Sequence, residues 1–206
     1  MNDLNFYKRI KDLRNAEKIL EENNIKLNIN FIIEDLIKEK EEEGKLREKL
    51  KLNPDDYKLH NKFGDILQDL EEYEEAEKEY QKALKINPDS YETHNNLGLL
   101  FYKLKKYEEA EKEYRKALKL NPEYAVTHYN LGNLLDDLKQ YDEAYNEYKI
   151  AVKQEAKFAE LLSYLAVIVS ENKEEEKRRL ILSKNLFTEI GNPEKIIEIE
   201  KILNNL

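Results

Sequence analysis

Residues 91–124 read YETHNNLGLLFYKLKKYEEAEKEYRKALKLNPEY, and a similar pattern stands one 34-residue step before and one after them. Asn-Pro keeps this step as Asn53-Pro54, Asn87-Pro88 and Asn121-Pro122. Further residue types recur at the same interval, at His60, His94 and His128, Gly64, Gly98 and Gly132, Ala76, Ala110 and Ala144, and Tyr80, Tyr114 and Tyr148. The chain therefore contains three internal repeats, which we place at 57–90, 91–124 and 125–158.

Apolar residues within each repeat follow the period of an α-helix. In the middle repeat one apolar stripe runs from His94 to Leu104 and a second runs from Ala110 to Leu118, with a polar break between them. Each repeat is therefore predicted to form two antiparallel helices whose apolar faces meet. Asn-Pro suits the start of the following helix, with Asn as N-cap and Pro at the first helical position.

The spacing of these residues resembles the tetratricopeptide repeat. In the middle repeat the resemblance is carried by His94, Leu97-Gly98, Phe101, Tyr107, Ala110, Tyr114, Ala117 and Pro122. The first repeat matches the same positions, and the third matches through Ala151 but has Ala156 where the closing proline would fall. Histidine stands in place of the usual tryptophan in all three repeats. The resemblance implies an all-α fold, a right-handed superhelical solenoid of antiparallel helix pairs.

The flanking segments carry weaker versions of the pattern. We expect residues 1–56 to form N-terminal helices and a degenerate capping unit, with one helix over 4–22 and another over about 31–52. Residues 159–206 are expected to form a degenerate fourth repeat and a C-terminal capping helix from about Glu194 to Leu203. Degenerate ends are the expected way to shield the last apolar faces of such an array.

Composition excludes several classes of protein. The 44 acidic residues outnumber the 35 basic ones, for a formal charge of −9, and this balance argues against nucleic acid and anionic membranes as partners. There is no cysteine, and therefore no disulfide or thiolate metal site. The longest apolar stretch, from Leu161 to Val169, is too short to span a membrane, and no signal peptide is visible at the start. We expect a soluble cytoplasmic protein.

The recurring residues are expected to serve packing. A glycine inside a helix costs stability, so its recurrence at one position indicates close contact between the two helices. The three histidines lie on the apolar stripes a whole helix pair apart, which is too far to share one metal ion. We therefore predict a packing role for histidine and tyrosine, and no metal, cofactor or catalytic residue.

A binding surface is expected on the first helix of each repeat, on the side away from the apolar stripe. In the tetratricopeptide family this side resembles the lining of a concave peptide-binding groove. The predicted groove residues are Asn61, Lys62, Asp65, Asn95, Asn96, Tyr102, Tyr129, Asn130, Asn133, Asp136 and Asp137.

Amides and carboxylates dominate this predicted groove. Asn96 and Asn130 occupy one position in successive repeats, similar to the asparagine ladder of some family members, although Lys62 breaks the ladder in the first repeat. The family's carboxylate clamp matches at only one of its five positions, so a clamp is not expected. The excess of carboxylates favours a neutral or basic ligand.

Two functions remain open from the sequence. The first is a non-enzymatic interaction scaffold that binds a peptide or protein segment in the concave groove. The second is a self-associating structural protein that assembles through its terminal helices. An enzyme is the third and weakest reading, because no nucleophile elbow, phosphate loop or paired metal-ligand motif is present.

Overall fold

The computed structural model describes residues 3–22, 30–169 and 172–206, and these residues are helices joined by short turns, with no β-strand. They fall into two compact units, Met1–Asp89 and Ser90–Leu206. The three-part division made from the sequence stays a prediction.

The first unit contains four helices. They are α1 (Asp3–Glu22), α2 (Asn30–Leu52), α3 (Tyr57–Asp69) and α4 (Tyr73–Ile86), of which α3 packs on both α2 and α4. An ion-pair network joins α2 to α4: the Arg47 guanidinium lies 2.8 Å from Glu43 on its own helix and 3.2 Å from Glu75 on α4. The helices expected before the first repeat are therefore present, and the second of them packs on that repeat.

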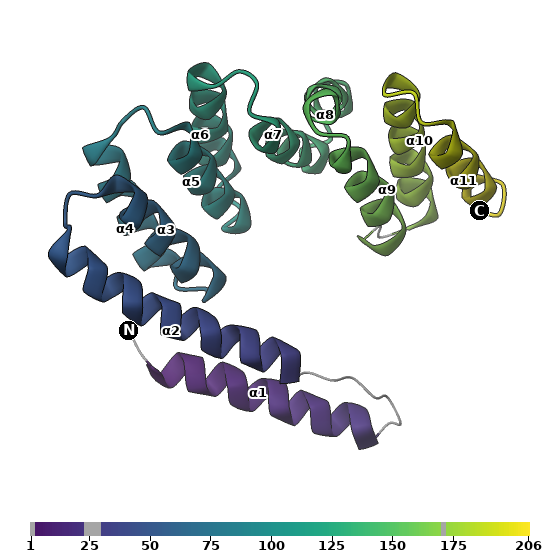
Figure 1. Ribbon diagram of the computed structural model, residues 1–206. Coiled ribbons are helices and arrows are strands. Elements are labelled where there is room, and N and C mark those ends of the chain that lie inside the picture. Colours follow the sequence, from purple (N-terminus) through teal and green to yellow (C-terminus); the bar gives the residue numbers. More distant parts are fainter. Residues whose placement is uncertain (1–2, 23–29, 170–171) are drawn as a thin grey trace. The chain divides into compact units, whose positions relative to one another are not determined.

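The second unit is a series of helices in which neighbours along the chain pack together (Figure 1). The helices are α5 (Tyr91–Lys103), α6 (Tyr107–Leu120), α7 (Ala125–Asp137), α8 (Tyr141–Gln154), α9 (Lys157–Val169), α10 (Lys173–Glu189) and α11 (Pro193–Leu203). Consecutive helices form the pairs α5/α6, α7/α8 and α9/α10, as the resemblance implies, and α10 also packs on α8 and α11.

The repeated glycines allow the two helices of a pair to approach. A Cβ atom added at Gly64, Gly98 or Gly132 would lie only 2.5 to 2.7 Å from the tyrosine ring of the partner helix. Those rings belong to Tyr80, Tyr114 and Tyr148, which are at most 2% exposed. The packing role predicted for these glycines is confirmed, since any side chain at these positions would displace the ring.

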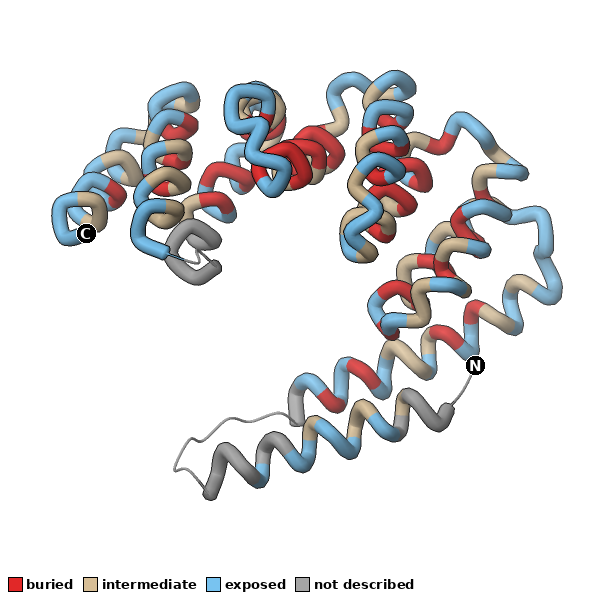
Figure 2. The backbone as a smooth tube through the Cα atoms, turned by 180° about the vertical axis from the view of Figure 1, so that it is seen from behind, coloured by how far each residue is buried: buried red, intermediate tan, exposed pale blue. Residues whose placement is uncertain are grey.

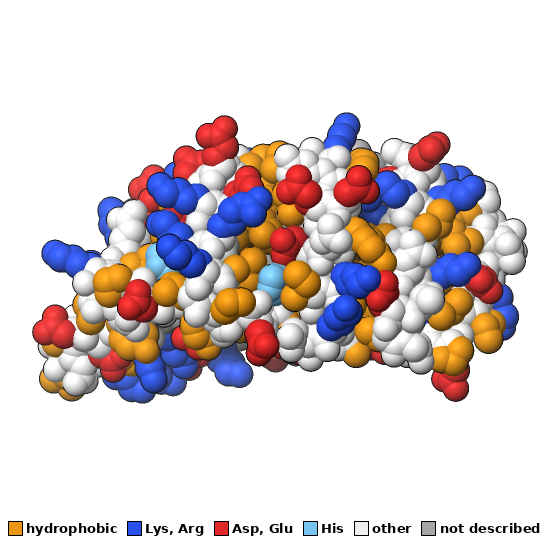
Figure 3. Space-filling model, turned by 90° about the horizontal axis from the view of Figure 1, so that it is seen from above, with side chains coloured by type: hydrophobic (Ala, Val, Ile, Leu, Met, Phe, Trp, Pro, Cys, Tyr) orange, Lys and Arg blue, Asp and Glu red, His pale blue; other side chains and the backbone are white. Residues whose placement is uncertain are grey.

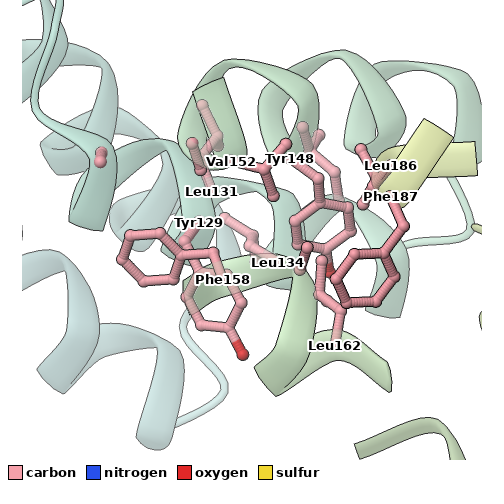
Figure 4. Close-up of a cluster of buried hydrophobic side chains, with 14 of the residues drawn as sticks. Tyr129, Leu131, Leu134, Tyr148, Val152, Phe158, Leu162, Leu186 and Phe187 are labelled. Atoms are coloured by element: carbon pink, nitrogen blue, oxygen red, sulfur yellow. The ribbon is translucent and has the colours of Figure 1, made fainter. Parts of the chain in front are cut away.

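Buried residues lie along the facing sides of the paired helices (Figure 2). In the second unit they form a continuous cluster that runs from Ala110 on α6 to Ile199 on α11. Figure 4 shows part of it, where Tyr148 and Val152 of α8, Phe158 and Leu162 of α9, and Leu186 and Phe187 of α10 lie together. One shared apolar interior therefore holds the successive helices of this unit together.

The Asn-Pro turns differ from the expectation. Asn87 and Asn121 lie after α4 and α6 as C-caps, and their side-chain oxygens accept the backbone N–H two residues further on. The N-caps of the next helices are instead Ser90 and Tyr124. The prediction that Asn is the N-cap was wrong here, because the chain needs a turn before the next helix begins. It holds for Asn192-Pro193, where Asn192 caps α11.

Candidate functional site

The predicted groove residues of the first unit lie on α3 and already have protein partners. Lys62 is exposed and pairs with Glu42 of α2 at 2.5 Å. The half-buried carboxylate of Asp65 accepts a 2.8 Å hydrogen bond from the hydroxyl of Tyr80. Asn61 is half-buried and also engaged. These side chains therefore help to hold α3 against the helices next to it.

The asparagines of the second unit hydrogen-bond to one another. The side-chain oxygen of Asn95 accepts from Thr127 Oγ1 at 2.9 Å and from Asn130 Nδ2 at 3.1 Å, so it joins α5 to α7. Asn95 Nδ2 in turn donates to Asn96 Oδ1 at 3.1 Å. Asn95 itself is buried, whereas Asn96 and Asn130 are partly exposed. The ladder therefore stabilises the contact between first helices, with Asn96 and Asn130 at its surface.

Two further predicted residues, Tyr129 and Asp136, are buried. The ring of Tyr129 stacks on Phe158 with 4.8 Å between centroids. Arg178 of α10 forms two hydrogen bonds with Asp136, at 2.6 and 3.1 Å, and Arg179 lies 3.3 Å from the same carboxylate. These side chains therefore belong to the packing of α7 against α9 and α10, because their polar and apolar surfaces are covered by those helices.

Four predicted residues come together in a pocket of about 300 Å³ in the second unit. Tyr102 of α5 and Asn133, Asp136 and Asp137 of α7 line it, and Tyr148, Leu162, Arg179 and Leu182 complete it from α8, α9 and α10. The helices α5 and α7 supply polar groups, and α9 and α10 supply two leucines together with the guanidinium of Arg179. Such a pocket suits a side chain with an apolar stem and a polar end.

Hydrogen bonds fix the tyrosines around this pocket. The Tyr102 hydroxyl donates to Asp137 Oδ2 at 2.5 Å, and the Tyr148 hydroxyl donates to Asn133 Oδ1 at 2.9 Å. Burial, together with the bonded carboxylate, raises the pKa of Tyr102, and burial raises the pKa of Tyr148. Both hydroxyls therefore remain protonated donors at any physiological pH.

Opposite charges form specific pairs around the pocket. Although burial disfavours its charge, the hydrogen bond to Asp136 raises the pKa of Arg178, which also lies over the ring of Tyr141 at 4.0 Å. Arg179 pairs with both Asp136 and Glu175. Lysine and arginine also alternate with acidic side chains on the face shown in Figure 3. Individual ion pairs therefore determine the electrostatics here, and the surface does not carry an extended potential of one sign.

The predicted groove does not include the part of the pocket that α10 provides. Arg179 and Leu182 lie in the degenerate fourth repeat, beyond the three repeats from which the groove was predicted. The link from Asp136 to Arg178 joins positions 42 residues apart. Only the packing of α10 brings them together.

The described residues show neither a metal centre nor a membrane span. No group of three or more histidine or acidic side chains among them could hold a metal ion. No helix in the described ranges is both long enough and apolar enough to cross a membrane. The predicted packing role of the histidines is supported, since His60, His94 and His128 are at most 8% exposed and each bonds a glutamate of the paired helix.

Comparison with protein families places three matches within residues 64–146. Residues 64–105 match a family described as TPR repeat, and residues 91–124 and 113–146 match two described as tetratricopeptide repeat. No curated protein matches the chain.

Solved structures share the fold at low sequence identity. A MamA crystal structure is 18% identical, with a TM-score of 0.53, covering 78% of this chain and 83% of its own. The pilF protein of Pseudomonas aeruginosa is 19% identical, with a TM-score of 0.55. The match covers 85% of this chain and 70% of the pilF chain. YrrB, described as a TPR protein with an unusual peptide-binding site, is 20% identical, with a TM-score of 0.54, covering 75% and 88%.

Proposed function

We propose that this chain, which is a tetratricopeptide-repeat protein, is a non-enzymatic scaffold whose second unit binds an extended segment of a partner protein. The segment lies along the first helices α5 and α7 and inserts one side chain into the pocket beside Tyr102 and Asp137. The observation that carries the proposal is this pocket, to which four predicted groove residues contribute. The peptide-binding site named for YrrB, which has a similar fold, is consistent with it.

The asparagine ladder supports binding by making the wall rigid. Because Asn95 joins Asn130 to Asn96, the two first helices present their surface amides in one arrangement before a partner arrives. A preformed surface loses less conformational entropy on binding. Asn96 and Asn130 each retain exposed surface, and an amide can pair with the backbone of an extended segment.

Charge favours a lysine or arginine in the pocket. The carboxylates of Asp136, Asp137 and Glu175 outnumber the guanidinium groups of Arg178 and Arg179 by one. Asp136 is covered by both arginines, whereas Asp137 is exposed. A basic side chain can place its stem against Leu162 and Leu182 and its cation near Asp137 and the ring of Tyr102.

Charge reversal at Asp137 tests this assignment. The variant Asp137→Lys should retain fewer partners in affinity capture, and its affinity for a synthetic peptide from the captured partner should fall about tenfold. Asp142→Lys is the matched control, because Asp142 is an exposed aspartate in the first turn of α8, outside the pocket lining. Equal peptide affinity of the two variants would contradict the proposed site.

Self-association is the second candidate, and exposed isoleucines at the C-terminal helices favour it. Ile181 of α10 is 42% exposed and Ile197 of α11 is 54% exposed. Measurement of mass by light scattering over a wide concentration range separates the two functions. A monomer at every concentration removes the assembly function, whereas a dimer that Ile197→Lys dissociates supports it.

A further inference from the structure

Each of the three repeats contains the same pair of a buried histidine and a glutamate. His60 of α3, His94 of α5 and His128 of α7 lie with Nδ1 at 2.6 Å from a carboxylate oxygen of the second helix. The glutamates are Glu79, Glu113 and Glu147, each 19 residues after its histidine. These three pairs include every histidine of the chain.

In the first and third repeats the other ring nitrogen faces the turn that precedes the first helix. His60 Nε2 lies 2.8 Å from the carbonyl oxygen of Pro54, and His128 Nε2 lies 2.9 Å from that of Pro122. A carbonyl oxygen only accepts hydrogen bonds, so Nε2 must carry a hydrogen. The imidazole therefore joins three segments: the turn, the first helix and the second helix.

Counting hydrogens shows that each such pair holds one extra proton. With Nε2–H committed to the proline carbonyl, a neutral ring would direct the Nδ1 lone pair at an ionised carboxylate only 2.6 Å away. The other neutral tautomer would set the Nε2 lone pair against the carbonyl oxygen. Both contacts are repulsive, and a proton on Nδ1 removes the conflict, because the ring then donates to both oxygens.

Surrounding charges differ between the repeats. Lys82 lies 2.6 Å from Glu79, and Lys116 lies 2.7 Å from Glu113, whereas Ile150 occupies the equivalent position beside Glu147. These lysines bond the carboxylate oxygen that the histidine does not use. On the first repeat, Arg47 of the adjacent α2 pairs with Glu75, one turn before Glu79.

Electrostatics agree with a retained proton. Desolvation opposes the charge of His128, but the hydrogen bonds to Glu147 and to the Pro122 carbonyl raise its pKa above the ordinary histidine value. Desolvation acts against ionisation of Glu113 as well, yet the hydrogen bonds from His94 and Lys116 lower its pKa. The hydrogen bonds of His128 therefore favour its protonated form, and those of Glu113 favour the ionised carboxylate.

We propose that the first and third repeats each contain a proton-binding site formed by their histidine and glutamate, and that loss of these protons above neutral pH loosens the two helix pairs. The proton leaves to solvent, and no other reactant is needed. Two facing acceptors then remain between the helices of these pairs. Proton binding by these pairs requires no partner protein, so this proposal does not depend on the proposed binding function.

The sign of the pH effect follows from linkage. A histidine that binds its proton more tightly when folded contributes stability that is complete below the unfolded-state pKa, about 6.5. That contribution is lost as the pH rises through the higher folded-state pKa. The chain has no cysteine, and histidine is the side chain whose ordinary pKa lies nearest neutrality.

Glutamine in place of the two glutamates provides the test. In the double variant Glu79→Gln, Glu147→Gln, the carboxamide N–H donates to Nδ1 of a neutral ring while Nε2–H keeps its carbonyl. The variant should retain the fold without the extra proton. Urea unfolding from about pH 6 to about pH 9 should show a falling midpoint for the natural chain and a flatter profile for the variant.

Nitrogen-15 spectra of the histidine rings give a second measurement, which needs no variant. At about pH 7, where a free histidine is mostly neutral, both ring nitrogens of His60 and of His128 should be protonated. Spectra that show neutral rings, or pH profiles that fall equally in the natural chain and the variant, would overturn the proposal. If the double variant fails to fold, Glu147→Gln alone serves, because Ile150 stands where Lys82 bonds the glutamate of the first repeat.

Discussion

At the scale of single residues, the molecule depends on a contact between a glycine and a tyrosine in each helix pair. The Cβ of Gly98→Ala would lie 2.7 Å from the ring of Tyr114. We expect this variant to lose about 1–3 kcal/mol of unfolding free energy, because the buried ring must shift. Gly44→Ala on α2 is the control, since its Cβ would meet nothing within 4 Å. It should gain about 0.5–1 kcal/mol from helix propensity. Denaturant titration of both variants should show a lower unfolding free energy for Gly98→Ala and a higher one for Gly44→Ala.

The tyrosine hydroxyls provide a second residue-scale prediction. Tyr148 donates to Asn133, but Leu99 stands at the corresponding position of the middle repeat, and the buried hydroxyl of Tyr114 has no partner among the described residues. Tyr148→Phe should therefore cost about 1 kcal/mol, whereas Tyr114→Phe should leave stability unchanged or higher. Equal losses in thermal unfolding would show that the Tyr114 hydroxyl is satisfied in solution.

At the scale of elements, the turns between paired helices have the geometry of a Schellman motif without its usual glycine. Lys105 has φ of 58°, and its neighbour Lys106 donates its backbone N–H to Phe101 at 2.9 Å. Glu71 and Lys139 adopt the same left-handed conformation in the other two repeats, while Gly191 occupies it between α10 and α11. The helix ends are thus determined by backbone hydrogen bonds at some conformational cost.

Relief of that cost should stabilise the turn. Lys105→Gly is expected to raise the unfolding free energy by about 0.5–1 kcal/mol, because glycine adopts positive φ without steric penalty. Lys105→Ala removes the same charge but keeps a Cβ, so its stability should change by less than about 0.5 kcal/mol. Chemical denaturation of the two variants side by side decides whether backbone strain or charge is responsible.

Helix starts are the element-scale feature that sequence reasoning placed incorrectly. Asn-Pro is compatible with an N-cap and with a turn, and the residue pair itself does not choose between them. The choice depends on where the preceding helix stops: α6 continues to Leu120, so Asn121 closes it. Before α11 the chain has already turned at Gly191, so Asn192 can cap the next helix.

At the scale of the whole molecule, the repeats were predictable because the features that define them lie close together along the chain. The 34-residue step, the apolar stripes and the helical breaks follow from covalent order and helix geometry. The candidate site was predictable only in part. Tyr102, Asn133 and Asp137 line the pocket as residues of the predicted groove, but α10 covers Asp136, and Tyr129 turns into the core.

The sequence by itself determined three repeats, their pairing of helices and the small residues at the helix contacts, since each follows from periodicity along one chain. Tertiary structure alone decided which polar groups meet: a histidine with a glutamate 19 residues away, and Asp136 with an arginine 42 residues away. Such partners depend on the rotation and translation of one helix against another. Those are set by the close packing of the whole apolar interior.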